Sequence, residues 1–113
     1  MNIEVAEERT DDALVLLPVG RLDSSNARAF ESIVMERIGG GERRLIVDFS
    51  RLDFISSAGM RVLLIAAKAL KTADGSLVLC AMKNHIQEVF RISGFDRIIP
   101  ITESREASAP GSA

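Results

Sequence analysis

The chain alternates between apolar runs that suit buried strands and segments whose apolar residues recur at helical spacing. Residues 44–49 (RLIVDF) and 76–82 (SLVLCAM) are continuous apolar runs with β-branched residues, a pattern typical of strands that are covered on both faces. Recurrence every three or four residues predicts helices over 25–38, 58–71 and 84–93. Strands that alternate with helices over short connections predict an α/β domain with a mainly parallel or mixed sheet.

Both ends of the chain add to this pattern. Residues 2–8 (NIEVAEE) and 13–19 (ALVLLPV) flank a short polar segment, which predicts a β-hairpin or at least two neighbouring strands. Residues 97–101 (RIIPI) predict a short final strand, and Pro100 suits an edge strand or a strand end. The last residues are poor in apolar side chains, so we expect a weak helical turn over 103–108 followed by disorder.

Length, charge and cysteine content narrow the possible functions. The 113 residues suffice for one domain, and the net charge of -2 disfavours direct nucleic-acid binding, because phosphate-binding surfaces are usually strongly basic. No apolar stretch approaches the ~18 residues that a membrane span needs, so we expect no membrane insertion. The single cysteine, Cys80, lies in an apolar run, which favours a buried reduced thiol and a cytoplasmic location.

The stretch DFISSAGMRVLL (residues 53–64) places Ser56 and Ser57 between an apolar run and a predicted helix. Hydrolases present a nucleophilic serine on such a corner, but this stretch lacks the first glycine of the G-x-S-x-G motif. The only histidine, His85, is predicted at a helix start, where a surface or capping role fits better than catalysis. One histidine and one cysteine also lack the ligand spacing of a metal site. We therefore predict no enzyme activity, no catalytic residue and no metal.

A serine at a helix start has two other uses. It can accept a phosphate, because the first backbone N–H groups of a helix lack intrahelical partners and the helix dipole is positive there. The phosphate would add about -1.5 to -2 charge to a surface that a partner had contacted in neutral form. Alternatively, Ser57 is a plain N-cap with no regulatory role. Both readings are open from the residues alone.

Three stretches together resemble the STAS domain of bacterial anti-sigma factor antagonists. They are VGRLDSSNARAF, LIVDFSRLDFISSAGMRVLL and GSLVLCAMKNHIQEVFRISGFDRIIPI, and the likeness runs from about residue 3 to residue 102. The resemblance implies an α/β STAS-type single domain over residues 1–102, with residues 103–113 as a short, mostly disordered tail. It also implies a four- to five-stranded mixed sheet and about four helices packed mainly on one face.

The resemblance also implies a function. Members of this family bind an anti-sigma factor that is also a serine kinase, and their binding releases a sigma factor for transcription. The kinase phosphorylates the antagonist and switches it off, and a phosphatase reverses the switch. ATP and magnesium belong to the kinase, so no cofactor is expected in this chain. An alternative use of the fold is as a scaffold or soluble subunit of a signalling or lipid-transport complex without phosphorylation control.

Matching the family pattern residue by residue assigns the site. Ser57 takes the place of the phosphorylated serine, with Ser56 in reserve, because Ala58 replaces the family's second hydroxyl. Asp23 matches a family acid, although it can equally be read as a cap of the first helix, in competition with Ser24 and Ser25. Gly59 is expected to allow close backbone approach at the helix start. The implied partner-binding residues are Asp23, Ser24, Ser56, Ser57, Ala58, Gly59, Met60 and Arg61.

Overall fold

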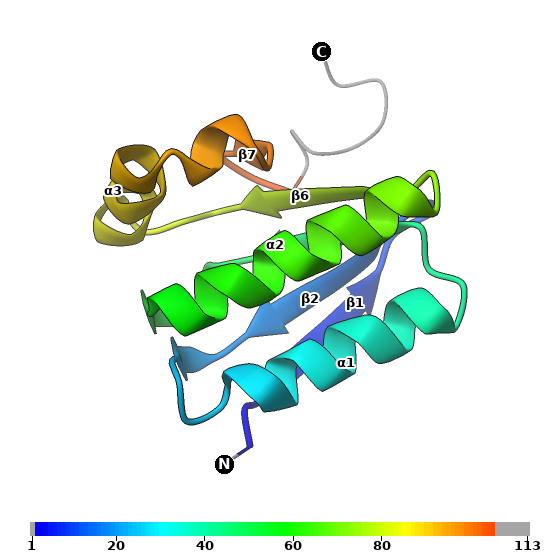
Figure 1. Cartoon of the computed structure of the whole chain (residues 1–113), viewed down its shortest axis with the longest axis horizontal. Coiled ribbons are helices and arrows are strands. Elements are labelled where there is room, and N and C mark those ends of the chain that lie inside the picture. The colour runs from blue at the N-terminus through cyan, green and yellow to red at the C-terminus, as the bar shows by residue number, and fades with distance from the viewer. Residues whose placement is uncertain (1, 106–113) are drawn as a thin grey trace.

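The computed structural model describes residues 2–105, and its main element is a five-stranded mixed sheet (Figure 1). The strand order is β1-β2-β4-β6-β7, in which β1 pairs antiparallel with β2 and every other pairing is parallel. The predicted hairpin and the predicted mixed sheet are therefore confirmed. The strands are β1 (Val5–Arg9), β2 (Leu14–Pro18), β4 (Arg44–Asp48), β6 (Ser76–Cys80) and β7 (Ile101–Thr102).

A second, two-stranded parallel sheet was not expected from the sequence. It consists of β3 (Gly20–Leu22) and β5 (Leu52–Ile55). Leu22 lies opposite Ile55 at the carboxyl ends of the two strands. Each strand is short and carries a polar residue in its middle, so neither shows the apolar pattern by which the longer strands can be recognised.

Within residues 2–105, three α-helices lie where the sequence predicted them. They are α1 (Ala27–Gly39), α2 (Ser57–Thr72) and α3 (Asn84–Ser93), and a short 3₁₀ turn, η1 (Phe95–Arg97), follows α3. Figure 1 shows α1 and α2 lying side by side in front of the main sheet. The resemblance implied about four helices, and residues 2–105 contain three α-helices and one 3₁₀ turn. Gly94 ends α3 in the left-handed conformation, with a φ of 81°.

Apolar residues are buried on both faces of the main sheet, as the continuous apolar runs predicted. The larger cluster fills the space between the sheet and the helices, where Phe90 makes edge-to-face contacts with Phe49 and Phe95 at centroid distances of 5.8 and 6.0 Å. Strand residues whose side chains point to the opposite face form a smaller cluster. This cluster contains Ala13, Val15, Leu17, Ile46 and the predicted buried thiol of Cys80.

The C-terminal part differs from the sequence prediction. The last strand covers only residues 101–102, because η1 occupies the segment before it and Pro100 has no N–H to donate. Residues 103–105 form a bend and not the predicted helical turn. Arg105 pairs with Asp48 at 2.9 Å and with Glu8 at 2.6 Å. The remainder of the predicted turn and tail lies outside the described residues.

Candidate functional site

The pairing of β3 with β5 brings together two corners that are 33 residues apart in the sequence. The backbone N–H of Ser56 donates to the carbonyl oxygen of Leu22 at 2.9 Å. Because the two strands run parallel, the turn that follows Leu22 and the helix that follows Ser56 leave the small sheet at the same edge. The Asp23 turn and the serine doublet, which the sequence singled out separately, therefore form one surface, called here the switch corner (residues 23–25 and 56–58).

The two serines have different roles in this corner. Ser56 is extended, with φ -94° and ψ 173°, and its side-chain oxygen accepts from the N–H of Gly59 at 3.4 Å. It is the N-cap of α2 and is partly buried. Ser57 is the first helical residue and is exposed. The reading of Ser57 as a plain N-cap is wrong, because α2 begins one residue earlier than predicted and the cap moves back to Ser56.

The Asp23 carboxylate organises the turn before α1. Its Oδ1 accepts from the backbone N–H of Ser25 at 2.9 Å and from the Ser25 hydroxyl at 2.6 Å. The Ser25 hydroxyl, its backbone N–H and the nearby Arg21 hold the pKa of Asp23 below its ordinary value, so the carboxylate is ionised at neutral pH. No hydrogen bond joins it to Ser56 or Ser57 within residues 2–105.

Capping of the first helix by Asp23, Ser24 or Ser25 is also wrong. The N-cap of α1 is Asn26, and its side chain makes no capping bond. Instead, the Asn26 side chain accepts from the N–H of Asp23 at 2.9 Å and donates to the carbonyl oxygen of Arg21 at 2.8 Å. The sequence placed the helix start two residues too early, because a serine doublet before an apolar stripe resembles a cap.

Gly59, in the first turn of α2, is needed for packing. A Cβ atom on Gly59 would lie 2.8 Å from Cγ of Leu22 and 2.9 Å from Cγ1 of Ile55, so the predicted close backbone approach is confirmed. The next residue, Met60, is 5% exposed and belongs to the main core. The prediction that Met60 contacts a partner is therefore wrong for its side chain, which packs in the core beneath α2.

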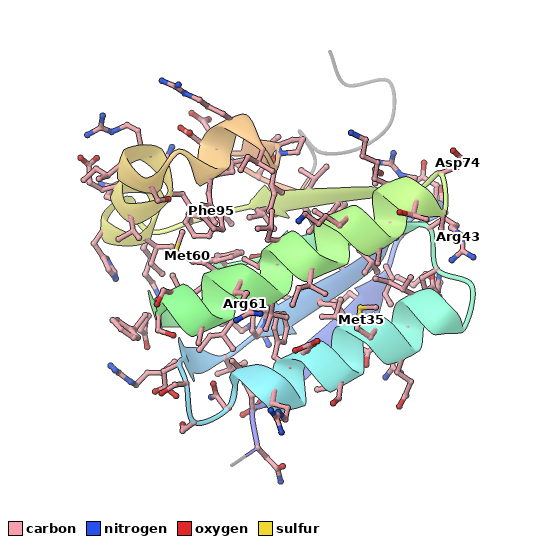
Figure 2. The ribbon with its side chains drawn as sticks, viewed as in Figure 1. Met35, Arg43, Met60, Arg61, Asp74 and Phe95 are labelled. Carbon is pink, nitrogen blue, oxygen red and sulfur yellow. The ribbon has the colours of Figure 1, made fainter. Side chains whose placement is uncertain are left out.

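A groove between α1 and α2 opens beside the switch corner. Figure 2 shows Arg61 on the side of α2 that faces α1, whereas Met60 points toward α3. The volume of the groove is about 410 Å³. Its lining residues are Ser24, Ala27, Arg28, Glu31, Ala58, Arg61, Val62 and Ile65. Sequence reasoning missed Arg28 and Glu31, because only the packing of α1 against α2 brings them to the corner.

Comparison with known proteins decides the family, because the family model of the STAS domain matches residues 4–108. The chain belongs to the STAS domain family. BtrV of Bordetella bronchiseptica, provisionally named an anti-sigma factor antagonist, is 44% identical over 107 residues, which cover 95% of this STAS domain chain and 92% of BtrV.

Two solved structures show the same STAS fold. One, from Thermotoga maritima and provisionally described as an anti-sigma factor antagonist, has a TM-score of 0.88 and 21% identity, and the match covers 92% of this chain and 90% of that one. The other is the phosphorylated form of SpoIIAA from Bacillus, with a TM-score of 0.71 and 22% identity. That match covers 93% of this chain and 96% of SpoIIAA. The resemblance read from the sequence is confirmed at the level of family and fold.

In this STAS domain a polar cluster fastens β5, which leads into the serine doublet, to the start of α3. The Lys83 ammonium donates to the carbonyl oxygen of Leu52 at 3.0 Å and to Asp53 at 2.6 Å, and this bond lowers the pKa of the Asp53 carboxyl. The Nε2 atom of His85 lies 2.7 Å from the carbonyl oxygen of Asp53. The histidine is exposed near the helix start, as predicted, and no hydrogen bond connects it to either serine within residues 2–105.

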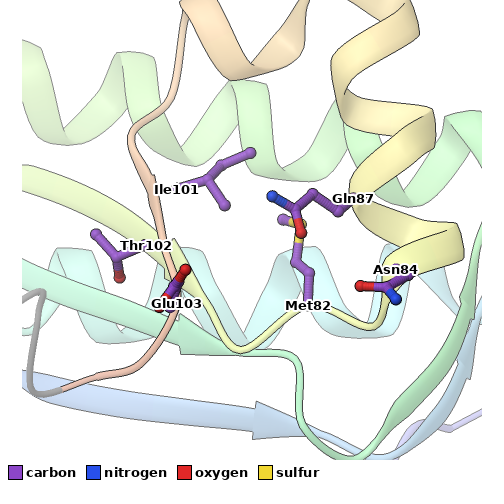
Figure 3. A pocket seen from close by; sticks show the side chains of 6 residues that line it. All are labelled: Met82, Asn84, Gln87, Ile101, Thr102 and Glu103. Atoms are coloured by element: carbon purple, nitrogen blue, oxygen red, sulfur yellow. The ribbon is translucent and has the colours of Figure 1, made fainter.

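A second pocket of about 300 Å³ lies away from the predicted residues, between the start of α3 and β7. Figure 3 shows the side chains that line it, which are Met82, Asn84, Gln87, Ile101, Thr102 and Glu103. None of the predicted site residues is among them. In the part of the chain that the structure describes, no three His, Cys, Asp or Glu side chains converge to hold a metal, and no helix is long and apolar enough to span a membrane.

Proposed function

We propose that this STAS domain is an anti-sigma factor antagonist whose activity is controlled by phosphorylation of Ser57. The unphosphorylated form binds an anti-sigma factor through the switch corner and thereby frees a sigma factor for transcription. The anti-sigma factor also acts as the serine kinase, and a phosphatase restores the binding form in the cytoplasm. The name of BtrV, which shares 44% of the aligned residues, supports the antagonist role.

The exposed position of Ser57 at the first residue of α2 is the observation that carries the proposal. Ser56 is partly buried and uses its side-chain oxygen for the cap, and Ala58 has no hydroxyl, so Ser57 is the exposed serine of residues 56–58. A phosphate there would lie at the positive end of the helix dipole, where the first N–H groups lack intrahelical partners. SpoIIAA, which shares the fold, has been solved in a phosphorylated form.

Electrostatics explains how the phosphate would act as a switch. Phosphorylation adds about -1.5 to -2 charge to a corner that already carries the ionised Asp23. A docked partner would have to bury or neutralise this charge. An uncompensated interfacial charge costs on the order of 2–5 kcal/mol, which corresponds to roughly 30-fold to several-thousand-fold weaker binding. The negative charge is favourable within the helix and unfavourable across the interface.

In the proposed phosphoryl transfer, this domain supplies the acceptor hydroxyl and the kinase supplies ATP and the catalytic base. The Ser57 hydroxyl attacks the γ-phosphorus of ATP held by the kinase, the bond to the β-phosphate oxygen breaks, and ADP leaves. The hydroxyl proton passes to a base of the kinase, as in other phosphoryl transfers to alcohols. The antagonist contributes only the acceptor oxygen and the surface that positions it.

The test begins with the anti-sigma factors encoded in the source genome, each purified and measured for binding to the unphosphorylated domain by calorimetry. The binder is then incubated with ATP, and the modified residue is mapped by mass spectrometry. Phosphate on the wild type and on Ser56→Ala, but not on Ser57→Ala, is the expected result. Full phosphate incorporation into Ser57→Ala would overturn the assignment. A stable complex with transport ATPase subunits, and with no anti-sigma factor, would favour the scaffold alternative.

A further inference from the structure

The groove between α1 and α2 has an apolar floor and a charged rim. Small and branched apolar side chains form the floor, which consists of Ala27, Ala58, Val62 and Ile65. The rim carries Ser24, Arg28 and Glu31 on the α1 side and Arg61 on the α2 side. Two of these residues, Ser24 and Ala58, also belong to the switch corner, so the groove is a continuation of that surface.

The two groove arginines are exposed and unpaired. Neither Arg28 nor Arg61 makes a side-chain hydrogen bond or ion pair with any residue between 2 and 105. Other arginines of this domain are engaged with carboxylates: Arg9 with Glu42, Arg37 with Glu7, Arg91 with Glu88, and Arg105 with Asp48. Glu31 adds one negative charge on the α1 wall, which leaves the rim with a net charge of +1 from its two arginines and one glutamate.

We infer that this groove receives a segment of the anti-sigma factor that places a carboxylate side chain between Arg28 and Arg61. The inference rests on the proposed function and names the chemistry of the partner segment. Guanidinium groups bind carboxylates with two parallel N–H···O bonds, and the apolar floor accepts the small apolar side chains next to the acid. The charge of the rim and the continuity of the groove with the switch corner both support this occupant.

The inference also links the groove to the switch. Residues four apart on a helix are neighbours on its surface, so a phosphate on Ser57 would lie within reach of Arg61. The phosphate would then draw the Arg61 guanidinium away from the partner's carboxylate. Phosphorylation thus weakens binding in two ways: by adding charge at the corner and by removing a cation from the groove.

Calorimetry with the purified anti-sigma factor from the binding assay above tests the inference. Arg28→Glu and Arg61→Glu are each expected to weaken binding by about tenfold or more. The matched control is Arg97→Glu, which reverses an exposed arginine on η1 outside the groove and should change the affinity by less than about twofold. Urea denaturation of each variant checks that the fold is intact, and Arg28→Gln and Arg61→Gln serve where a reversal unfolds the domain.

Two further measurements identify the occupant. Reversal of one partner aspartate or glutamate to lysine should restore binding to Arg61→Glu, and the loss caused by Ser57→Asp should be smaller in an Arg61→Ala background. If the wild type binds and both arginine variants bind equally well, only the groove assignment fails. If the wild type binds no anti-sigma factor, the proposed function and the groove assignment both fail. Wild-type dimers that Arg28→Glu dissociates in sedimentation would make a second copy the occupant and overturn the inference.

Discussion

The N–H of Ser56 donates to the carbonyl oxygen of Leu22, and this single bond lies where two parallel strands end together. Beyond it, one chain segment enters the Asp23 turn and the other enters α2. The position of the exposed Ser57 relative to Asp23 is therefore determined by backbone pairing and not by contacts between their side chains. A substitution at Ser57, whose side chain takes no part in this pairing, can therefore change the charge of the corner while leaving its geometry in place.

Replacement of Ser57 by aspartate should imitate the switched-off state. The aspartate carries less charge than a phosphate, so we expect affinity for the anti-sigma factor to fall by about 30-fold, the lower end of the range for an uncompensated interfacial charge. Calorimetry measures this loss. Thr72→Asp, at the exposed last residue of α2 and outside both the switch corner and the groove, is the control and should bind like the wild type. Wild-type affinity in Ser57→Asp would contradict the switch.

The same variant should not be less stable than the wild type. An acidic residue in the first turn of a helix interacts favourably with the dipole and typically adds about 0.3–1 kcal/mol. The free energy of unfolding of Ser57→Asp, measured in urea, should therefore equal or exceed that of the wild type. A marked loss of stability would mean that weakened binding reports unfolding.

Replacement of Gly59 by alanine should destabilise the domain although alanine is the better helix former. The new Cβ would lie within 3.0 Å of Leu22 and Ile55, and the resulting displacement of α2 should cost about 1–3 kcal/mol. Gly39→Ala in α1 is the matched control, because a Cβ there meets no atom within 4 Å. The control should be neutral or stabilising by up to about 1 kcal/mol. Equal stabilities of the two variants in urea would contradict the packing argument.

Replacement of Ser56 by alanine should separate capping from phosphorylation. Its capping bond to Gly59 is long, at 3.4 Å, so we expect a loss of about 0.5–1 kcal/mol, the lower part of the usual range for caps. Phosphate incorporation into Ser57 should continue at close to the wild-type rate. A variant that keeps its stability but loses phosphorylation would show that Ser56, and not Ser57, is the acceptor.

Asp48 should make part of the stability dependent on pH. Burial alone would raise the pKa of its carboxyl, but the Ser50 N–H and the Arg105 guanidinium outweigh burial and hold the pKa below its ordinary value. Because the pKa is lower in the folded than in the unfolded protein, Asp48 stabilises the fold fully at pH values above the pKa of the unfolded chain, about 3.9. This stabilisation is lost as the pH falls through the pKa of the folded state.

Comparison with Asp48→Asn isolates this contribution. At neutral pH the variant should be less stable by about 1.5–3 kcal/mol, the usual range for hydrogen bonds to a charged group. The difference in unfolding free energy should stay constant down to about pH 5 and shrink below about pH 4. Urea titrations at several pH values measure it. A difference that stays the same at about pH 3 would show that the charge of Asp48 contributes nothing.

Helices that bury one apolar stripe, and strands that bury both faces, could be predicted from the local pattern of apolar residues in the sequence. The helices were recognisable because residues such as Phe30 and Val34 in α1 return to the same face every four residues. Strands β4 and β6 were recognisable because residues on both of their faces are apolar. In these elements the local pattern and the tertiary packing require the same structure.

Features that depend on distant partners could not be predicted in this way. Strands β3 and β5 are defined by pairing with each other, and their own short sequences lack the apolar pattern of a strand. Ser56 and Ser57 are equally good caps by residue type, and the choice between them follows from the Leu22 bond and the close approach of Gly59. Arg28 and Arg61 belong to two different helices, and they line the same groove only once the chain has folded.

The edges of the main sheet limit how anything can attach to this domain. At one edge, β1 carries three consecutive charged residues, Glu7, Glu8 and Arg9, and at the other edge β7 is two residues long. Charged side chains along β1 and the shortness of β7 both disfavour the addition of an incoming strand. Association by strand addition is therefore disfavoured, and loops and helix ends remain as the attachment surface. A complex made this way can separate without breaking a backbone ladder, which suits the reversible partner binding proposed above.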